Sequence, residues 1–125
     1  MYTVIRFVAE SASAAEQLGR IGALLNEAIQ GAYERVDRIG GRFSVSLSTA
    51  DSWLAHVLAI GEFVRTADGV IAEARVNHVG VEIDVAVEPQ EISEKPYLSL
   101  AVSPHLMQHL SAVGVVMGFT FYNPA

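Results

Sequence analysis

The fold of this chain is decided by the stretch Val79–Glu88, which reads Val-Gly-Val-Glu-Ile-Asp-Val-Ala-Val-Glu. Side chains in a β-strand point alternately to its two faces, so the odd-numbered residues of this stretch, all Val or Ile, lie on one face. The acids Glu82, Asp84 and Glu88 lie on the other face. We therefore expect a strand with one face in a hydrophobic core and one acidic face in solvent.

Alternation in other parts of the chain predicts four more strands, at residues 2–9, 43–48, 97–102 and 115–122. The first of these is apolar on both faces apart from Arg6, which is typical of a strand inside a sheet. The face of the predicted sheet that lies away from the core carries small or acidic side chains and no Lys: Ser44, Ser46, Glu82, Asp84, Ser99, Thr120 and Tyr122.

Amphipathic stretches predict helices that cover the apolar face of the sheet. The first helix begins at a capping box of Ser13 and Glu16 and carries an apolar stripe as far as Ala32. Gly19 and Gly22 each lower helical stability by about 1 kcal/mol relative to Ala. We therefore expect both glycines to permit close packing of a neighbouring element.

Two further helices have clear start signals. One is predicted to begin at a cap on Thr49 or Asp51, with an inner side formed by Trp53, Leu54, Val57, Leu58, Gly61 and Val64. The other is predicted to begin at Ser103-Pro104 and to end at Gly114, because proline fits the first helical turn and glycine the left-handed residue after the last. Its inner stripe should consist of Leu106, Met107, Leu110 and Val113.

The connecting segments complete the predicted fold. Residues 69–77 alternate like a strand, but their Ala, Glu and Arg content favours a helix that ends at Asn77. The mixed-charge run 34–38 predicts a solvated connection, and the proline-bounded run 89–96 predicts a loop. The elements together predict a single α+β domain over residues 1–125: a two-layer sandwich with about five mostly antiparallel strands and helices packed on one face.

Composition excludes several classes of function. The chain has 125 residues, 51% of them hydrophobic, which is enough for one core, and it contains no Cys. Without disulfides, a signal-peptide pattern or a membrane-spanning run, we expect a cytoplasmic protein. The net charge of −6 argues against nucleic acid and anionic membranes as partners, because both bind basic surfaces. A basic protein partner is compatible with this charge.

No residue pattern predicts catalysis or a cofactor. His105 and His109 have the spacing of two metal ligands on a helix, but Leu106 stands where a zinc protease carries its Glu, which favours partly buried or surface histidines. Glu82 and Asp84 lie roughly 6–7 Å apart on one strand, but the aromatic cleft of a glycosidase does not accompany them. We therefore predict a protein that is not an enzyme and holds no metal.

Surface charge is the strongest functional signal in the sequence. Five acids lie within thirteen residues without an intervening base: Glu82, Asp84, Glu88, Glu91 and Glu94. Such a cluster focuses an electrostatic field that speeds association with a basic protein and disfavours acidic ones. The alternative is that the acids keep an exposed sheet face soluble and prevent it from pairing with other sheets. We predict that these five residues bind a partner.

A set of core motifs extends from Trp53 to Tyr122. It consists of a Trp-led helix at 51–63, the segment Ala72-Glu73-Ala74-Arg75, an alternating strand, and the run from Leu98 to Leu106 that continues to Gly118-Phe119-Thr120-Phe121-Tyr122. In these motifs the chain resembles a poorly characterised family of small bacterial α+β domains found beside toxin genes. The N-terminal third departs from that family by its longer helix. Neighbours of toxins are commonly immunity proteins, and no catalytic residues come with the resemblance.

The resemblance and the surface charge imply the same function. We predict an immunity protein that binds and neutralises a cognate toxin through the acidic face and the loop that follows it. A nuclease-type toxin needs a basic cleft for its polyanionic substrate, so an acidic face can block it. The alternative is a homo-oligomeric binding module whose open sheet face pairs with a second copy as a homodimer, and a small metal-dependent enzyme is less favoured.

Overall fold

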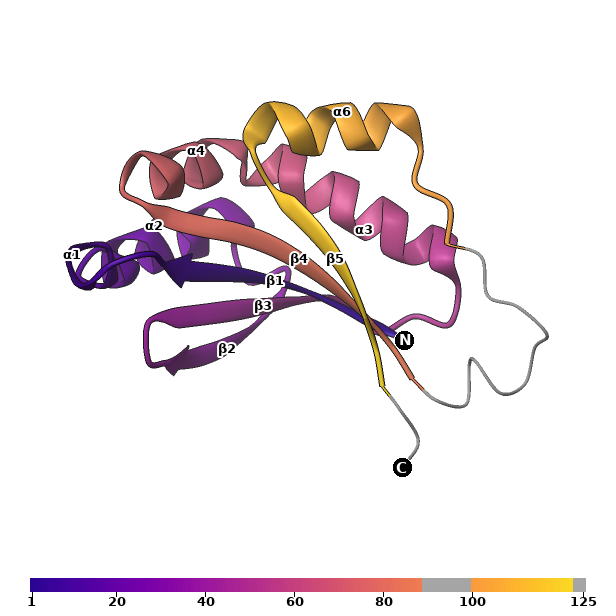
Figure 1. Cartoon of the computed structure of the whole chain (residues 1–125), viewed down its shortest axis with the longest axis horizontal. Coiled ribbons are helices and arrows are strands. Elements are labelled where there is room, and N and C mark those ends of the chain that lie inside the picture. Colours follow the sequence, from indigo (N-terminus) through magenta and orange to yellow (C-terminus); the bar gives the residue numbers. More distant parts are fainter. Residues whose placement is uncertain (89–99, 123–125) are drawn as a thin grey trace.

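The computed structural model describes residues 1–88 and 100–122 and has an α+β fold. Within these residues, five strands form one sheet in the order β2-β3-β1-β4-β5. The longer helices lie on one side of this sheet and leave its other side open (Figure 1). The elements follow one another along the chain as β1 (Tyr2–Ala9), α1 (Ala12–Ala15), α2 (Leu18–Ile29), β2 (Glu34–Ile39), β3 (Arg42–Ser48), α3 (Trp53–Thr66), α4 (Asp68–Val76), β4 (Val79–Val87), α6 (Pro104–Val113) and β5 (Val116–Phe121).

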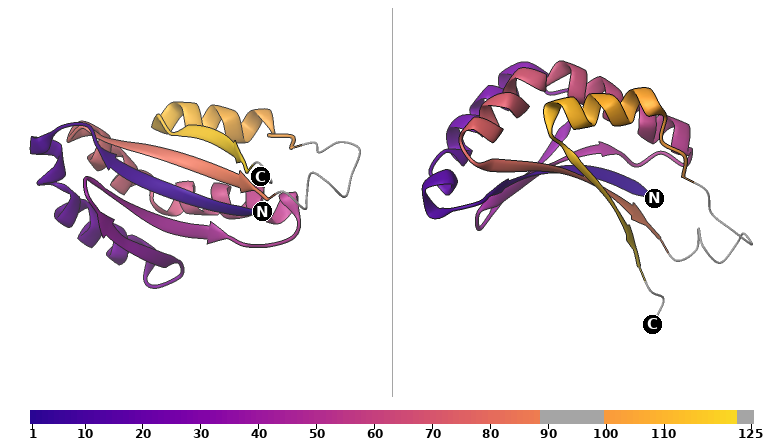
Figure 2. Two further views of the ribbon diagram at one scale, coloured as in Figure 1. Left: turned by 60° about the horizontal axis from the view of Figure 1, so that its bottom comes forward. Right: turned by 45° about the horizontal axis from the view of Figure 1, so that its top comes forward.

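The sheet is antiparallel except at one edge. β1 lies at its centre and runs antiparallel to β3 and β4, which confirms that the strand with two apolar faces is inside the sheet. β2 pairs antiparallel with β3 at one edge, whereas β5 pairs parallel with β4 at the other. A parallel neighbour needs a crossover connection. Here that connection includes α6, which lies above β4 and β5 in both views of Figure 2.

The pairing register of β1 and β4 builds the centre of the core. Ile5 lies opposite Ile83, and Phe7 lies opposite Val81. All four side chains are at most 4% exposed. The stretch Val79–Glu88 is therefore a strand as far as Val87, and its odd-numbered residues are buried as their alternation predicts.

The structure describes two of the connecting segments, so the secondary structure predicted for them can be compared with it. The run 34–38, predicted as a solvated connection, lies in the edge strand β2, so that prediction is wrong. Charged side chains are common in edge strands because they discourage pairing with other sheets. The charged residues of this run therefore led to the prediction of a connection instead of a strand. Residues 69–77 are confirmed as helical, since α4 covers all of them except Asn77, which follows its last turn.

The strand predicted at 97–102 is not found in the residues that can be compared. Residues 100–102 precede α6 without belonging to a strand. The other half of this prediction, together with the loop predicted at 89–96, lies outside the described residues.

The first predicted helix is two helices in the structure. Ser11, not Ser13, caps the short α1, because its hydroxyl accepts a hydrogen bond from the Ala14 amide at 3.1 Å. α2 ends at Ile29 rather than at Ala32, since the next residue adopts the left-handed conformation. The capping box predicted at residues 13 and 16 is therefore wrong, and the cap lies two residues earlier.

The ends of the later helices agree better with their signals. Ser52, rather than Thr49 or Asp51, caps α3 by accepting a backbone hydrogen bond at 3.2 Å. Ser103 caps α6, and Gly114 ends it with a φ of 70°, both as predicted. A left-handed residue at this place favours glycine because it has no Cβ.

The buried side of α3 is rotated from the predicted one. Leu54 and Leu58 are 66% and 64% exposed, whereas His56 and Phe63 are completely buried. Met107 on α6, also predicted to face inward, is 52% exposed. Helical periodicity shows which residues share a face, but the packing partner decides which face turns inward. Here a histidine with a buried hydrogen bond to Thr3 takes a core position that hydrophobicity does not predict.

Gly22 of α2 makes room for the side chain of Arg35 on β2. The guanidinium of Arg35 donates hydrogen bonds to the Gly22 carbonyl and to Asn26 Oδ1, both at 3.3 Å, and lies 4.5 Å from the centre of the Phe43 ring. A Cβ at Gly22 would lie 2.8 Å from Nη1 of Arg35, but one at Gly19 would meet nothing within 4 Å. Close packing, predicted for both glycines, is confirmed for Gly22 and wrong for Gly19.

Gly22→Ala is expected to lower the free energy of unfolding by about 1 kcal/mol, although Ala is the better helix former. The reason is that the added methyl displaces the Arg35 guanidinium from the Phe43 ring and from the helix carbonyl. Gly19→Ala, the matched control in the same helix, is expected to raise the free energy of unfolding by up to about 1 kcal/mol. Urea denaturation measures both. An equal gain from the two substitutions would show that Arg35 moves aside without loss.

Candidate interaction surface

The side of the sheet opposite the helices is the candidate surface, which we call the open face. Register places its residues: Arg6 on β1 lies between Ser44 on β3 and Glu82 on β4, and Asp84 lies opposite Gly118 on β5. The open face is defined by Val4, Arg6, Ser44, Ser46, Glu82, Asp84, Gly118 and Thr120. The prediction that the two serines, the two acids and Thr120 share one face is therefore confirmed, while Ser99 lies outside the described residues.

Arg6 is the charged residue of this face that the alternation of β4 does not predict. Its Nη1 donates to Asp84 Oδ2 at 3.0 Å and lies 4.0 Å from Glu82 Oε1. Thr120 donates from its hydroxyl to Asp84 Oδ1 at 2.7 Å. Both oxygens of Asp84 are therefore engaged, and its side chain is only 15% exposed. The signal was present, because Arg6 is the one charged residue of β1 and an antiparallel neighbour would bring it beside the acids.

The predicted acids differ in their availability to a partner. Glu82 is the most accessible of those on the open face, with a side chain that is 49% exposed. Glu88 follows the end of β4, and one of its carboxylate oxygens lies 3.5 Å from the N-terminal ammonium of Met1. Glu91 and Glu94 lie outside the described residues. The open face thus has a mixed charge rather than the purely acidic one that β4 by itself predicts.

Two tyrosines join the far end of the open face. The hydroxyls of Tyr2 and Tyr122 form a hydrogen bond of 2.6 Å, and their ring centres lie 6.5 Å apart. This hydrogen bond, followed by burial, raises the pKa of Tyr2 above its usual value. Tyr122 was predicted on this face, and its contact with Tyr2 confirms the position.

A cavity of about 240 Å³ opens on this face between β1, β4 and β5. Arg6, Glu82, Asp84 and Thr120 contribute its polar lining, and Val116 contributes an apolar wall. Alternating charges and a hydroxyl in a shallow depression suit a side chain from another protein better than a deeply enclosed small molecule.

His105 and His109, the two histidines with the spacing of metal ligands, line one cavity. His105 is exposed and His109 half-buried on α6, where they line a cavity of about 210 Å³ with Glu62 and Arg65 of α3. His56 is completely buried in the core instead. No group of three or more His, Asp or Glu side chains in residues 1–88 and 100–122 is arranged to hold a metal ion.

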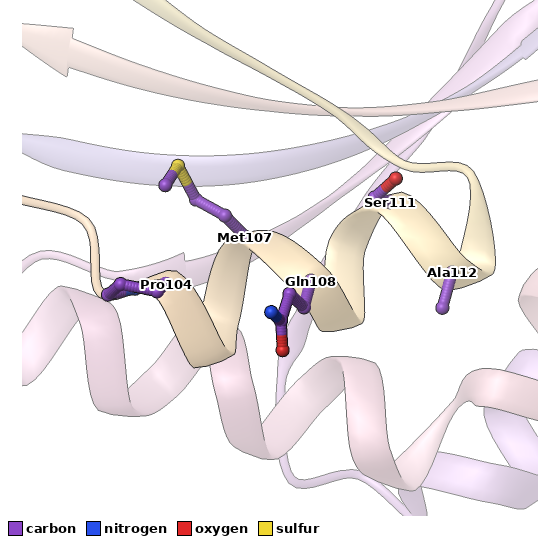
Figure 3. A pocket seen from close by; sticks show the side chains of 5 residues that line it. All are labelled: Pro104, Met107, Gln108, Ser111 and Ala112. Atoms are coloured by element: carbon purple, nitrogen blue, oxygen red, sulfur yellow. The ribbon is translucent and has the colours of Figure 1, made fainter.

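Another hollow, of about 500 Å³, lies along α6. Figure 3 shows that its lining residues, Pro104, Met107, Gln108, Ser111 and Ala112, all belong to this one helix. Ligand sites bring polar groups together from several elements. This hollow is therefore the flank of a helix and does not compete with the open face as a candidate site.

Comparison of the chain with protein-family models, with curated proteins and with solved structures finds no match. The resemblance to bacterial domains found beside toxin genes therefore stays a prediction. In the part of the chain that the structure describes, no helix has both the length and the apolar character needed to cross a bilayer.

Proposed function

We propose that this protein is an immunity protein that binds and neutralises a basic bacterial toxin through the open face. The observation that carries the proposal is the uncovered sheet face on which the exposed Glu82 stands beside the ion-paired Asp84. The protein acts by binding rather than by catalysis, and it acts in the cytoplasm, where the targets of a nuclease-type toxin lie.

Arg6 gives this proposal a specific mechanism. In the free protein it neutralises Asp84 and approaches Glu82, at 3.0 and 4.0 Å. A cationic side chain of the toxin that enters the cavity on the open face would compete with Arg6 for these two carboxylates. Arg6 therefore lowers the affinity for basic partners, and only a partner whose surface fits the sheet can offset that loss.

Opposite effects of two substitutions test this mechanism. Glu82→Lys is expected to weaken binding of the protein encoded by the adjacent toxin gene by roughly 10- to 100-fold, because it replaces an attraction by a repulsion at the contact. Arg6→Gln is expected to strengthen binding, because it frees both carboxylates for the partner. Titration calorimetry measures the affinities, and a thermal melt of each variant checks its fold.

Glu27→Lys on α2 is the matched control, since it makes the same charge change on an exposed helix residue. It is expected to leave the dissociation constant within about twofold, because screening weakens a distant charge. If the substitutions at 27 and 82 weaken toxin binding equally, the effect comes from the net charge of the protein. That result would contradict the proposed site. Absence of binding to the adjacent gene product would contradict the proposed function.

A further inference from the structure

β5 is an edge strand of the sheet that the described residues form, and charged side chains do not protect this edge. It pairs with β4 on one side, and no described strand pairs with its other side. Its sequence, Val-Met-Gly-Phe-Thr-Phe, has no charged residue, whereas β2 at the opposite edge has four in six, Glu34, Arg35, Asp37 and Arg38. Charges on an edge strand prevent pairing with other sheets. Of the two edges, β5 is the one that can accept another strand.

Apolar side chains are exposed along this edge. Val116 is 68% exposed, Phe119 is 37% exposed, and Phe121 is 57% exposed. On the helix side of the sheet, an apolar groove of about 380 Å³ runs between β5 and α6, with Met107 and Met117 in its walls. Figure 1 shows α6 above the upper part of β5. A strand added to β5 would cover these side chains and extend the groove.

We propose that the strand added to β5 is β5 of a second copy of this chain, paired antiparallel. Charge favours this edge for self-association: each copy carries a net charge of −6, and the repulsion between two copies is smaller where they meet along an uncharged strip than where acids face each other. The acid of β4 nearest the middle of this strand, Asp84, is already neutralised by Arg6. The pairing joins the two sheets into one continuous sheet.

Backbone directions decide the register of the pair. The Tyr122 amide donates to the Val87 carbonyl of β4 at 3.2 Å. Because successive amides of a strand point to opposite edges, the amides of Met117, Phe119 and Phe121 point to the free edge. A two-fold axis at Phe119 pairs Met117, Phe119 and Phe121 with Phe121, Phe119 and Met117 of the second copy, respectively. An axis at residue 118 would instead place Phe121 opposite Val115, whose amide already donates to Leu110.

The side chains agree with an axis at Phe119. On the helix side, Phe119 then lies opposite Phe119 of the second copy, and Met117 lies opposite its Phe121. Aromatic pairs and sulfur–aromatic contacts both stabilise cross-strand neighbours. Because the axis is perpendicular to the sheet, both open faces stay uncovered and on the same side. The inference is therefore independent of toxin binding.

The small area of the contact between the two strands predicts a weak dimer. A strand of six residues is about 20 Å long, so an edge-to-edge pair with its flanking side chains buries less than the ~800 Å² per partner of a standard interface. We expect a dissociation constant on the order of 10–1,000 µM. The pairing becomes visible only when concentration is varied across that range.

Sedimentation velocity across this range tests the proposal. The mass of the wild-type protein is expected to rise from 13.4 kDa towards twice that value. Phe121→Lys is expected to weaken the dimer at least about tenfold, because it places two cations on the paired edges. Val76→Lys is the matched control, since Val76 is 76% exposed on α4, away from β5. A monomer at every concentration, or equal effects of both substitutions, would overturn the proposal.

Single cysteines test the register, because the chain has no Cys of its own. With the axis at Phe119, cysteines at this position would have Cα atoms about 5.5 Å apart, within disulfide range. Cysteines at Gly118 would be about 8 Å apart, outside that range. Under mild oxidation, Phe119→Cys is expected to form disulfide-linked dimers much faster than Gly118→Cys. Equal or faster linkage at position 118 would overturn the register.

Discussion

His56→Ala is expected to lower the free energy of unfolding by about 3–5 kcal/mol, because it empties a core site and takes a hydrogen bond from each of two polar groups beside it. His56 and Thr3 are both completely buried. The Thr3 hydroxyl lies 2.8 Å from Nδ1 of His56, and the carbonyl oxygen of Ala50 lies 2.7 Å from Nε2. Since a carbonyl can only accept, Nε2 carries a hydrogen and donates it to the Ala50 carbonyl.

The position of these groups explains the size of the expected loss. His56 joins α3 to the start of β1 through a buried hydrogen bond with Thr3, and to the segment before α3 through a partly buried one with Ala50. Removal of the ring leaves the buried Thr3 hydroxyl without this partner, at about 1–3 kcal/mol, and takes a hydrogen bond from the partly buried Ala50 carbonyl. The empty volume adds a further loss, because the surrounding core collapses only in part.

Guanidinium denaturation measures this prediction, with His105→Ala as the control. His105 is exposed on α6, and its removal is expected to change stability by less than about 0.5 kcal/mol. Thr3→Val removes the same hydrogen bond from the other side. In a double-mutant cycle, residues 3 and 56 should show a coupling of about 0.5–3 kcal/mol. Additive losses would mean that the Thr3–His56 hydrogen bond contributes nothing.

Phe7→Ala is expected to cost about 3–5 kcal/mol, because Phe7 is completely buried at the centre of the sheet. Its ring stacks on that of Phe43 with ring centres 4.8 Å apart and an angle of 12° between the planes. The Arg35 guanidinium in turn lies over Phe43. Loss of the Phe7 ring therefore leaves a cavity beside Phe43 on the paired strands β1 and β3 and removes one support of the edge strand β2.

Two comparisons separate burial from aromatic character in this prediction. Phe121→Ala removes the same ring from a residue that is 57% exposed, so we expect a loss below about 1 kcal/mol. Phe7→Leu keeps the site apolar and nearly filled, so we expect a loss below about 2 kcal/mol. Thermal and urea denaturation measure all three. Equal losses from Phe7→Ala and Phe121→Ala would contradict the core assigned to β1.

Local patterns predicted most of the strands and both ends of α6. Alternation places residues 79–87 and 2–9 in strands because burial of one face needs a period of two. Ser103 and Gly114 bound α6 because caps act within one helical turn. β2 was missed, because an edge strand is held by backbone hydrogen bonds to a neighbour and tolerates charged side chains.

The candidate surface was predicted in position but not in charge. Alternation places Glu82 and Asp84 on one face of β4, yet the electrostatics of that face depend on β1, which is distant in sequence. Pairing of the two strands brings Arg6 within 3.0 Å of Asp84. A run of acids within one strand therefore overstates the negative charge that a partner meets.

The sequence of Val79–Glu88 determined that this stretch forms a strand with one buried and one polar face, because alternation acts residue by residue. Its neighbours in the sheet were decided by packing of the whole chain, which placed β1 on one side and β5, after the α6 crossover, on the other. Backbone hydrogen bonds pair any two strands equally well, so the choice depends on helix packing and connection lengths that no short pattern records. The pairing of β4 with β1 places Arg6 beside Asp84, and the pairing of β4 with β5 leaves β5 at the edge of the sheet.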